Sequence, residues 1–445
     1  KPYKIKVKLK GGTWFHWMYD KKSYYIKFED NVKPEKIFYI PEKRSIFGEH
    51  LIHQISKHIG LESLETTFGE LYINNKNKGL YYVSDNFDKY FLLKNNLPEA
   101  NIYHTDSFGV RLAGSSIEKI NKNMFIGGIK KYKARFNQDI DYFLDVINKD
   151  VTYLEKNWEK HFDKENLIKL LSIYLLSGTV HYDLHNLYFY INPTNGKIYF
   201  FPWDFMNFSN AENLGQKFNL PGNVDYKNVN QILTKLLKIG QIRYFRNKFI
   251  YENGDNLISY IQKFKNDDLP YIISAMLTDS TVPLSFAQGQ ISLLGFMHIP
   301  KTIIDNIGYQ IQKIKNNFTK LNFNAHKIYN NIVRLELDLL TYSGINIDYI
   351  KINYENNIST SAIKKNLQFF SDIQYKDELG SIIKIKPTTH NIDIQVDENK
   401  TIKNIEIQYS NIFDKKDIKI ISSNIEVKET IKTNGRTFEK LYDTI

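Results

Sequence analysis

The sequence predicts an α+β protein built from a β-rich lobe, a mainly helical lobe and a small all-β module at the C-terminal end. The spacing of apolar side chains changes along the chain from two residues to about four and back again, which indicates strands, then helices, then strands. The 445 residues include 42% hydrophobic and 14% aromatic side chains, enough for large cores. We expect the two lobes at residues 1–95 and 96–355, and the β-rich module at residues 380–445.

The composition excludes several classes of chemistry. The chain has no cysteine, which rules out disulfide bonds, thiolate zinc sites, iron–sulfur clusters and a cysteine nucleophile. The net charge is +11, but the lysines are scattered along the chain, so we expect no nucleic-acid partner. No apolar run approaches the ~18 residues of a transmembrane helix. Because the chain starts at Lys1 rather than Met, we expect a removed N-terminal piece, for which a secretion signal is one candidate.

The elements predicted for the first lobe alternate between strand and helix. They are, in order, strands over residues 2–10 and 23–28, a helix over 46–59, and a hairpin over 68–74 and 80–83. The helix is indicated by Phe47, Leu51 and Ile55, which recur every four residues, and by Gly60, a natural C-cap. Glu49 lies on another face of the same helix.

The middle of the chain predicts helices around one hairpin. Helical spacing covers residues 86–94, 140–147 and 165–176 and, for the most part, 229–343. Two strand-like runs, 180–190 and 198–205, flank the turn signal Asn195-Gly196 and predict a hairpin. Short β-like runs beyond residue 380 predict the all-β module, with a boundary near residues 355–380.

The densest group of polar residues surrounds the predicted hairpin. His181, Asp183 and His185 occupy alternate positions of an extended segment and therefore face the same side. Asn186 follows directly, and the turn of the hairpin brings Asp204 back towards Asp183. We expect two carboxylates, an amide and imidazoles in one small volume.

Such a set of side chains suits phosphoryl transfer. One carboxylate accepts or orients the proton of the attacking hydroxyl, while the second carboxylate and the amide oxygen hold a divalent metal that neutralises nucleotide phosphates. The order and approximate separation of Asp183, Asn186 and Asp204 match those of the corresponding residues in protein kinases.

Residues of the first lobe are candidates for contacts to phosphates. In protein kinases a strand lysine paired with a helix glutamate holds the phosphates of the nucleotide. Lys21 or Lys22, at the opening of the second strand, and Glu49 on the helix have this arrangement. Gly12 and Thr13 belong to a loop of the kind whose backbone N–H groups cover phosphates.

At these residues the sequence resembles the CotH-like kinases, a family named for a spore coat protein. The resemblance covers about residues 1–210 and leaves out the C-terminal β module. It rests on Lys-Leu-Lys-Gly-Gly-Thr at 8–13, Lys-Lys-Ser-Tyr at 21–24, Leu-Tyr-Ile-Asn at 71–74, Gly-Leu-Tyr at 79–81, Asn-Ile-Tyr at 101–103, Asp-Leu-His-Asn at 183–186 and Phe-Pro-Trp-Asp at 201–204.

The resemblance implies a two-lobed, protein-kinase-like fold that uses ATP with Mg²⁺ or Mn²⁺ to phosphorylate Ser or Thr hydroxyls of proteins. It also implies an extracellular, cell-surface or coat location, with a coat or surface protein as the substrate. The roles that it implies are phosphate contact for Lys22 or Lys21, pairing for Glu49, catalysis for Asp183, and metal binding for Asn186 and Asp204.

The sequence also departs from the family pattern, and two alternatives stay open. Met206 stands where the family commonly has a second acid, and Asp85 stands where a Glu is usual. The missing acid favours a pseudokinase, or an assembly component of a coat or surface structure, as one alternative. The other alternative is a metal-dependent hydrolase that uses His181, Asp183 and His185 as zinc or manganese ligands.

Overall fold

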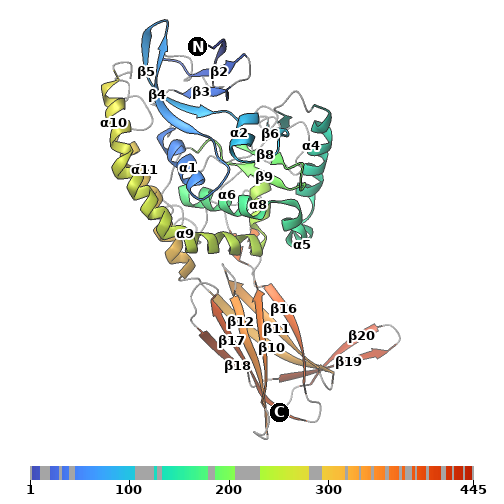
Figure 1. The fold of residues 1–445 in the computed structure, drawn as a ribbon. Helices are drawn as coiled ribbons and strands as arrows, with labels where there is room; N and C mark the ends of the chain where they lie inside the picture. The colour runs from blue at the N-terminus through green and yellow to red at the C-terminus, as the bar shows by residue number, and fades with distance from the viewer. Residues whose placement is uncertain are drawn as a thin grey trace. The chain divides into compact units, whose positions relative to one another are not determined.

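The structure of the protein is a computed structural model that describes most of the chain. The described residues are 3–10, 21–29, 33–39, 46–105, 125–127, 133–178, 186–205, 231–279, 293–315, 319–329, 332–341, 345–355, 360–369, 373–375, 383–385, 388–396, 400–411, 417–422, 425–433 and 436–442. They divide into two compact units, Lys1–Leu237 with Glu252–Ile311 and Lys238–Tyr251 with Gln312–Ile445. Figure 1 shows helices mixed with sheets in the first unit and mainly strands in the second, which confirms the predicted α+β class.

Among the described residues, five antiparallel strands form the first sheet, in the order β1-β2-β3-β5-β4. Their bounds are β1 Ile5–Leu9, β2 Tyr24–Phe28, β3 Lys36–Tyr39, β4 Thr66–Ile73 and β5 Lys76–Asp85. Helix α1, Ile46–His58, comes between β3 and β4 in the chain. The strands and the helix predicted for this lobe are confirmed, and β3 is an additional strand.

Strand β1 forms where it was predicted, but its apolar row is not buried. The strand lies at the edge of the sheet, where Tyr3, Ile5, Val7 and Leu9 are 45–58% exposed. An alternating pattern predicts that a strand has two different faces, but it does not say whether another element covers one of them. The alternation of apolar residues with lysines over residues 2–10 predicts a strand that is buried on one face, and the exposure of β1 shows that this expectation is wrong.

Helix α1 covers one face of the sheet at β4 and β5. Its apolar side chains Leu51 and Ile55 are buried, as their helical spacing predicts. The His50 ring lies 5.2 Å from Phe68 and 6.4 Å from Tyr82, measured between ring centroids. Phe68 and Tyr82 are opposite each other in the β4–β5 register and so project from the same face.

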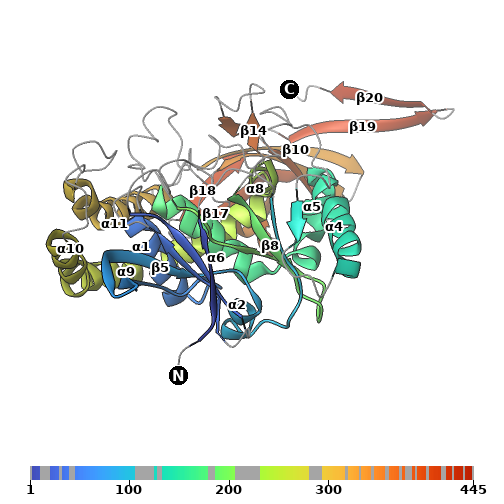
Figure 2. The same cartoon turned by 90° about the horizontal axis from the view of Figure 1, so that it is seen from above.

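The rest of the first unit surrounds a second sheet with helices. The order of this sheet is β7-β6-β8-β9. Its strands are β6 Ile102–Thr105, β7 Phe125–Gly127, β8 Tyr188–Ile191 and β9 Ile198–Phe201. Strands β8 and β9 form the predicted hairpin, but residues 186–187 and 202–205 of the predicted runs 180–190 and 198–205 are not strand. The helices are α2 Lys89–Lys94, α4 Lys133–Asn148, α5 Val151–His161, α6 Lys164–Ser177, α8 Gln231–Leu237 and α10 Leu269–Thr278, together with α9 Gly240–Asp267 and α11 Leu293–Lys315, which both units share. In Figures 1 and 2, α4 and α5 lie at the same end of this part.

Helix α6 fixes the hairpin β8–β9 to the segment after α1. Asp163 caps the helix by accepting the N–H of Asn166, and Gly178 ends it with a left-handed φ of 62°. Asn166 Oδ1 accepts the N–H of Phe200 in β9 at 2.8 Å, and its Nδ2 donates to Glu62 Oε2 at 2.7 Å.

Within the helices that the structure describes, none combines the length and the apolar character needed to cross a bilayer.

The second unit is mainly a pair of facing β-sheets. In the described residues their orders are β16-β11-β10-β19-β20 and β13-β12-β17-β18, beside a short pair β14-β15. The strands are β10 Thr319–Tyr329, β11 Ile332–Thr341, β12 Ile345–Tyr354, β13 Thr360–Phe369, β14 Ile373–Tyr375, β15 Ile383–Ile385, β16 Thr388–Gln395, β17 Ile402–Asn411, β18 Asp417–Ser422, β19 Ile425–Thr433 and β20 Arg436–Tyr442. Buried side chains of both sheets, such as Leu335 and Ile350, form one core.

The β-structure starts earlier than the sequence predicts. Residues 319–329 and 332–341 form β10 and β11, so the prediction of helix up to about residue 343 is wrong there. Strand β12 also falls within the lobe predicted to be mainly helical, and β13 occupies the predicted boundary region. Buried Val333, Leu335 and Leu337 alternate with polar residues along β11, a period-two pattern that does indicate a strand.

Candidate active site

Two of the predicted site residues lie at one end of the hairpin β8–β9. The two strands pair antiparallel, and their first pair is Tyr188 with Phe201. Asn186 comes two residues before β8, and Asp204 comes three residues after β9. Because antiparallel strands begin and end side by side, both residues leave the hairpin at the same end.

Asp204 has an uncommon backbone conformation. Its φ is +55°, in the left-handed region, where residues with a side chain are strained and where Asn and Asp are tolerated best. The other residues with positive φ in the described chain, glycines apart, are Asn74, Asn75 and Asn96. Strain of this kind persists where the surrounding structure holds the backbone in place, often at functional sites.

On one side of Asp204, its neighbour Trp203 belongs to an aromatic cluster. The Trp203 ring lies 5.6 Å from Phe87, which follows β5, and 5.4 Å from Tyr188 of β8, measured between centroids. Burial raises the pKa of Tyr188, and the negative charge of Asp204 raises it further. The Tyr188 phenol therefore stays protonated, within electrostatic reach of the Asp204 carboxylate.

On the other side, Phe205 is held by two helices. Its buried ring stacks on Tyr174 of α6 with 5.1 Å between centroids. It also meets His53 of α1 nearly edge-on, with 6.4 Å between centroids. Asp204 thus lies between two anchored aromatic residues, which limits the freedom of its backbone.

Glu49, the predicted partner of the lysine, is buried on α1 beside a histidine. His53 Nε2 lies 3.6 Å from Glu49 Oε1, and His53 Nδ1 lies 2.7 Å from Ser63 Oγ. Burial lowers the pKa of His53 to about 3, with smaller effects from His50 and Lys57. The His53 ring is therefore neutral at physiological pH, and its contact with Glu49 involves one charged group rather than two.

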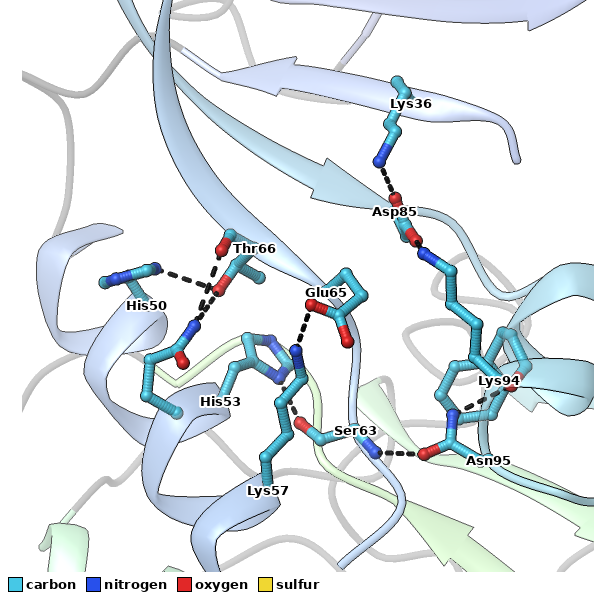
Figure 3. A network of polar contacts seen from close by, with 12 residues as sticks. Lys36, His50, His53, Lys57, Ser63, Glu65, Thr66, Asp85, Lys94 and Asn95 are labelled. Atoms are coloured by element: carbon cyan, nitrogen blue, oxygen red, sulfur yellow. Dashed lines mark hydrogen bonds and ion pairs between the residues drawn. The ribbon is translucent and has the colours of Figure 1, made fainter. Parts of the chain in front are cut away.

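A network of polar contacts attaches α1 to the segment that leads into β4, as Figure 3 shows. The contacts of α1 are His50 Nδ1 with Thr66 Oγ1 at 2.9 Å, His53 Nδ1 with Ser63 Oγ at 2.7 Å, and an ion pair between Lys57 and Glu65. The N–H of Ser63 in turn donates to Asn95 Oδ1, at the end of α2, at 3.3 Å. This network fixes the rotation of α1 about its axis and thereby the direction in which Glu49 points.

Asp85, which departs from the family pattern, joins three elements. Its buried carboxylate pairs with Lys36 of β3, and its second oxygen accepts from Lys94 Nζ of α2 at 2.6 Å (Figure 3). Asp85 is itself the last residue of β5. The carboxylate thus holds the end of the first sheet to α2, a structural role.

Lys21 and Lys22 lie directly before β2, next to β5. Lys21 is buried, and its Nζ pairs with Asp279 Oδ2 at 2.9 Å. The same ammonium lies 5.1 Å from the centroid of the Tyr81 ring. Lys22 is half-buried, and its carbonyl accepts the Tyr81 hydroxyl at 3.1 Å. The pairing of either lysine with Glu49 stays a prediction.

Several predicted residues lie outside the described part of the chain, namely Gly12, Thr13, His181, Asp183, His185 and Met206. Within the described part, no three His, Asp or Glu side chains are arranged to share a metal ion. Asn186 and Asp204 offer an amide and a carboxylate oxygen, the donors that Mg²⁺ prefers. The two residues therefore fit a magnesium site that takes its other ligands from phosphates or water.

The model of the CotH kinase protein family matches residues 7–265. The chain belongs to this family. It is also 26% identical, over 153 residues, to the inner spore coat protein H of Bacillus subtilis (strain 168). That match covers 33% of this chain and 42% of the relative, so the chain spans about two fifths of the relative's length. The resemblance to CotH-like kinases that the sequence indicates is thereby confirmed.

The CotH match contains Lys21, Glu49, Asn186 and Asp204, but it ends before Asp279. No sequence motif indicates Asp279, because it pairs with a residue 258 positions away and follows an ordinary helix. The sequence indicates the contacts of Phe205 with α1 and α6 only weakly. An aromatic residue directly after Asp204 predicts that this position is buried, but it does not predict which helices cover it.

Proposed function

We propose that this CotH-family protein transfers the γ-phosphoryl group of ATP to a Ser or Thr hydroxyl of a protein. The observation that carries the proposal is that Asn186 and Asp204 lie at the same end of the hairpin β8–β9. Asp183 comes three residues before Asn186 in the sequence. A carboxylate for the proton, next to an amide and a carboxylate for a metal, is the set that phosphoryl transfer uses.

The proposed reaction proceeds by direct attack of the protein hydroxyl. The Asp183 carboxylate accepts the hydroxyl proton while the oxygen forms a bond to the γ-phosphorus. The bond between that phosphorus and the β–γ bridging oxygen breaks, and ADP leaves with the electron pair. Asn186 and Asp204 would hold Mg²⁺ or Mn²⁺, whose positive charge would neutralise the phosphates.

The first sheet provides the phosphate contacts in this proposal. Lys21 or Lys22, before β2, contacts the phosphates, and Gly12 and Thr13, earlier in the sequence, add backbone N–H groups. Buried Glu49 on α1 orients the lysine. The order β1-β2-β3-β5-β4, with a helix between β3 and β4, supports a kinase-like first lobe, since in protein kinases the phosphate lysine and its glutamate belong to a strand and the helix αC.

We also propose a coat or surface protein as the substrate, and a coat-associated or extracellular location for the protein. The support is the name of the Bacillus subtilis relative, an inner spore coat protein, together with membership of the same family.

The test is incorporation of labelled phosphate from ATP in the presence of Mg²⁺. The wild type should label itself or a basic, Ser-rich protein, and a chelator should abolish the labelling. Asp204→Asn and Asp183→Ala should each lower the rate by about 100-fold or more. Asp145→Asn, which changes an exposed carboxylate of α4, is the matched control and should keep the wild-type rate.

Three outcomes separate the proposal from its alternatives. Absence of labelling together with absence of a thermal shift by ATP contradicts it. A thermal shift by ATP without any labelling supports a pseudokinase instead. Tightly bound, stoichiometric zinc that survives dialysis supports the metal-dependent hydrolase.

A further inference from the structure

We propose that Lys21 and Asp279 form a buried latch between the start of β2 and the end of α10, and that Lys22 is consequently the lysine that contacts the ATP phosphates. The first half concerns the fold alone. The second half rests on the proposed phosphotransferase function and decides between two neighbouring lysines that the sequence leaves equivalent.

The latch is a well-formed ion pair that water scarcely reaches. Lys21 Nζ and Asp279 Oδ2 are 2.9 Å apart, and their side chains are 4% and 5% exposed. The same carboxylate oxygen accepts the backbone N–H of Leu80 in β5 at 2.6 Å. Asp279 directly follows α10, so one carboxylate binds the end of this helix to two segments of the first sheet (Figure 1).

The surroundings of Lys21 leave its charge committed to Asp279. On its other side, the ammonium lies 5.1 Å from the centroid of the buried Tyr81 ring, a cation–π contact. A phosphate group could reach this ammonium only by separating it from Asp279, which would leave a buried carboxylate without its cation. Because that separation is costly, Lys21 is a poor phosphate ligand.

Lys22 is adjacent and differently placed. Its side chain is half-buried, whereas that of Lys21 is almost fully buried. Its carbonyl accepts the Tyr81 hydroxyl at 3.1 Å, and the next carbonyl, of Ser23, accepts the N–H of Lys10 at 2.9 Å. The backbone that follows the Cα of Lys22 is therefore anchored at two successive carbonyls, which gives the side chain a defined origin beside β5.

One residue of the latch, Lys21, lies inside the part of the chain that matches the family, and the other lies outside it. The family match ends at residue 265, and Asp279 lies beyond it. The structure thus assigns to the end of α10 a structural role, which is to hold the start of β2 through the pair of Asp279 with Lys21.

The latch is tested by a double-mutant cycle on the full chain without nucleotide. Lys21→Met and Asp279→Leu should each lower the melting temperature by roughly 5–10 °C, because each leaves a buried group without its partner. The combination Lys21→Met with Asp279→Leu should lower it by clearly less than the sum of the single changes. Lys22→Met is the matched control and should shift it little. Additive effects would overturn the latch.

The choice of lysine is tested by the KM for ATP at a temperature at which every variant is folded by circular dichroism. Lys22→Met should raise this KM by about tenfold or more, the value of one charge-assisted hydrogen bond. Lys21→Met with Asp279→Leu should keep it within about threefold of the wild type. An equal loss in both variants would show that Lys21 contacts the phosphates and would overturn the second half.

The two proposals fail in different ways. If the wild type neither binds nor hydrolyses ATP, the phosphotransferase function and the role of Lys22 both fall, while the melting temperatures still decide the latch. If the wild type is active and the cycle is additive, only the latch is wrong.

Discussion

His53 is a fully buried histidine on the helix that carries Glu49, and its environment makes stability depend on pH. Burial lowers the pKa of His53 to about 3 and that of the neighbouring His50 to about 4, while an unfolded chain binds these protons near pH 6.5. Below pH 6.5 the unfolded state therefore binds more protons than the folded state. The free energy of unfolding should fall as the pH falls, by up to about 1.4 kcal/mol per pH unit and per histidine.

This prediction is checked by urea unfolding of the full chain between pH 7 and pH 5. His53→Gln removes one of the two rings and should make the dependence on pH shallower. Ser63→Ala removes the partner of Nδ1 but keeps the ring, so it should lower stability at every pH and retain the wild-type slope. An unchanged slope in His53→Gln would show that His53 is not the group that titrates.

At the scale of elements, α1 and α6 hold the end of the hairpin through Phe205, which stacks on Tyr174 and meets His53. Phe205→Leu should lower stability by about 1–2 kcal/mol and should lower the rate of phosphoryl transfer at least tenfold, because Asp204 loses its anchored neighbour. Stability and labelling rate are measured on the same preparation.

The control for Phe205 is Phe162, an equally buried aromatic residue in the same unit. Phe162 packs on Phe200, in the strand rather than at the end of the hairpin. Phe162→Leu should cost similar stability and leave the rate near that of the wild type. If both variants lose activity alike, the loss follows stability, and Phe205 has no special role in placing Asp204.

The sequence predicts helices and turns that residues close together in the chain determine. It does not predict contacts between residues that are far apart in the chain. The spacing of Leu51 and Ile55 predicted α1, and the Asn195-Gly196 turn predicted the hairpin that carries Asn186. The sequence could not predict the latch at Asp279, because residues far apart in the chain meet only through the tertiary fold.

Strand β12 shows how a β-bulge changes the spacing of the inward-facing residues of a strand. A bulge between Ile347 and Tyr349 shifts the register, so the next inward-facing residue is Ile350, three positions on. Beyond the bulge the inward positions alternate again, at Ile350, Ile352 and Tyr354. The spacing of three interrupts the period-two pattern, so β12 has a weak strand signal, although the helical spacing itself is predicted only up to about residue 343.

At the scale of the whole molecule, the two units have separate cores, and the chemistry is proposed for the first alone. Leu335 is fully buried in the core of the second unit. Leu335→Ala should destabilise that unit by about 2–5 kcal/mol. At a temperature at which both units are folded, it should leave the labelling rate within about twofold of the wild type. The exposed Val7→Ala in β1 should change neither quantity, within about 0.5 kcal/mol.

For Leu335→Ala, the rate of phosphoryl transfer by the folded variant is the measurement that decides whether the second unit takes part in the reaction. A large loss of phosphoryl transfer, with the first unit still folded by its own thermal transition, would show that the β-sheets of the second unit take part in the reaction.

The most direct test of the proposed site, Asp183 with Asn186 and Asp204, asks which phosphate of ATP is transferred. The protein is incubated with Mg²⁺ and ATP labelled either in the γ-phosphate or in the α-phosphate, beside Asp204→Asn. The proposed reaction predicts incorporation of the γ-label, none of the α-label, and loss of the signal in the variant. Incorporation of the α-label would demonstrate transfer of a nucleotidyl group instead, and γ-labelling that persists in Asp204→Asn would contradict the assignment of the site.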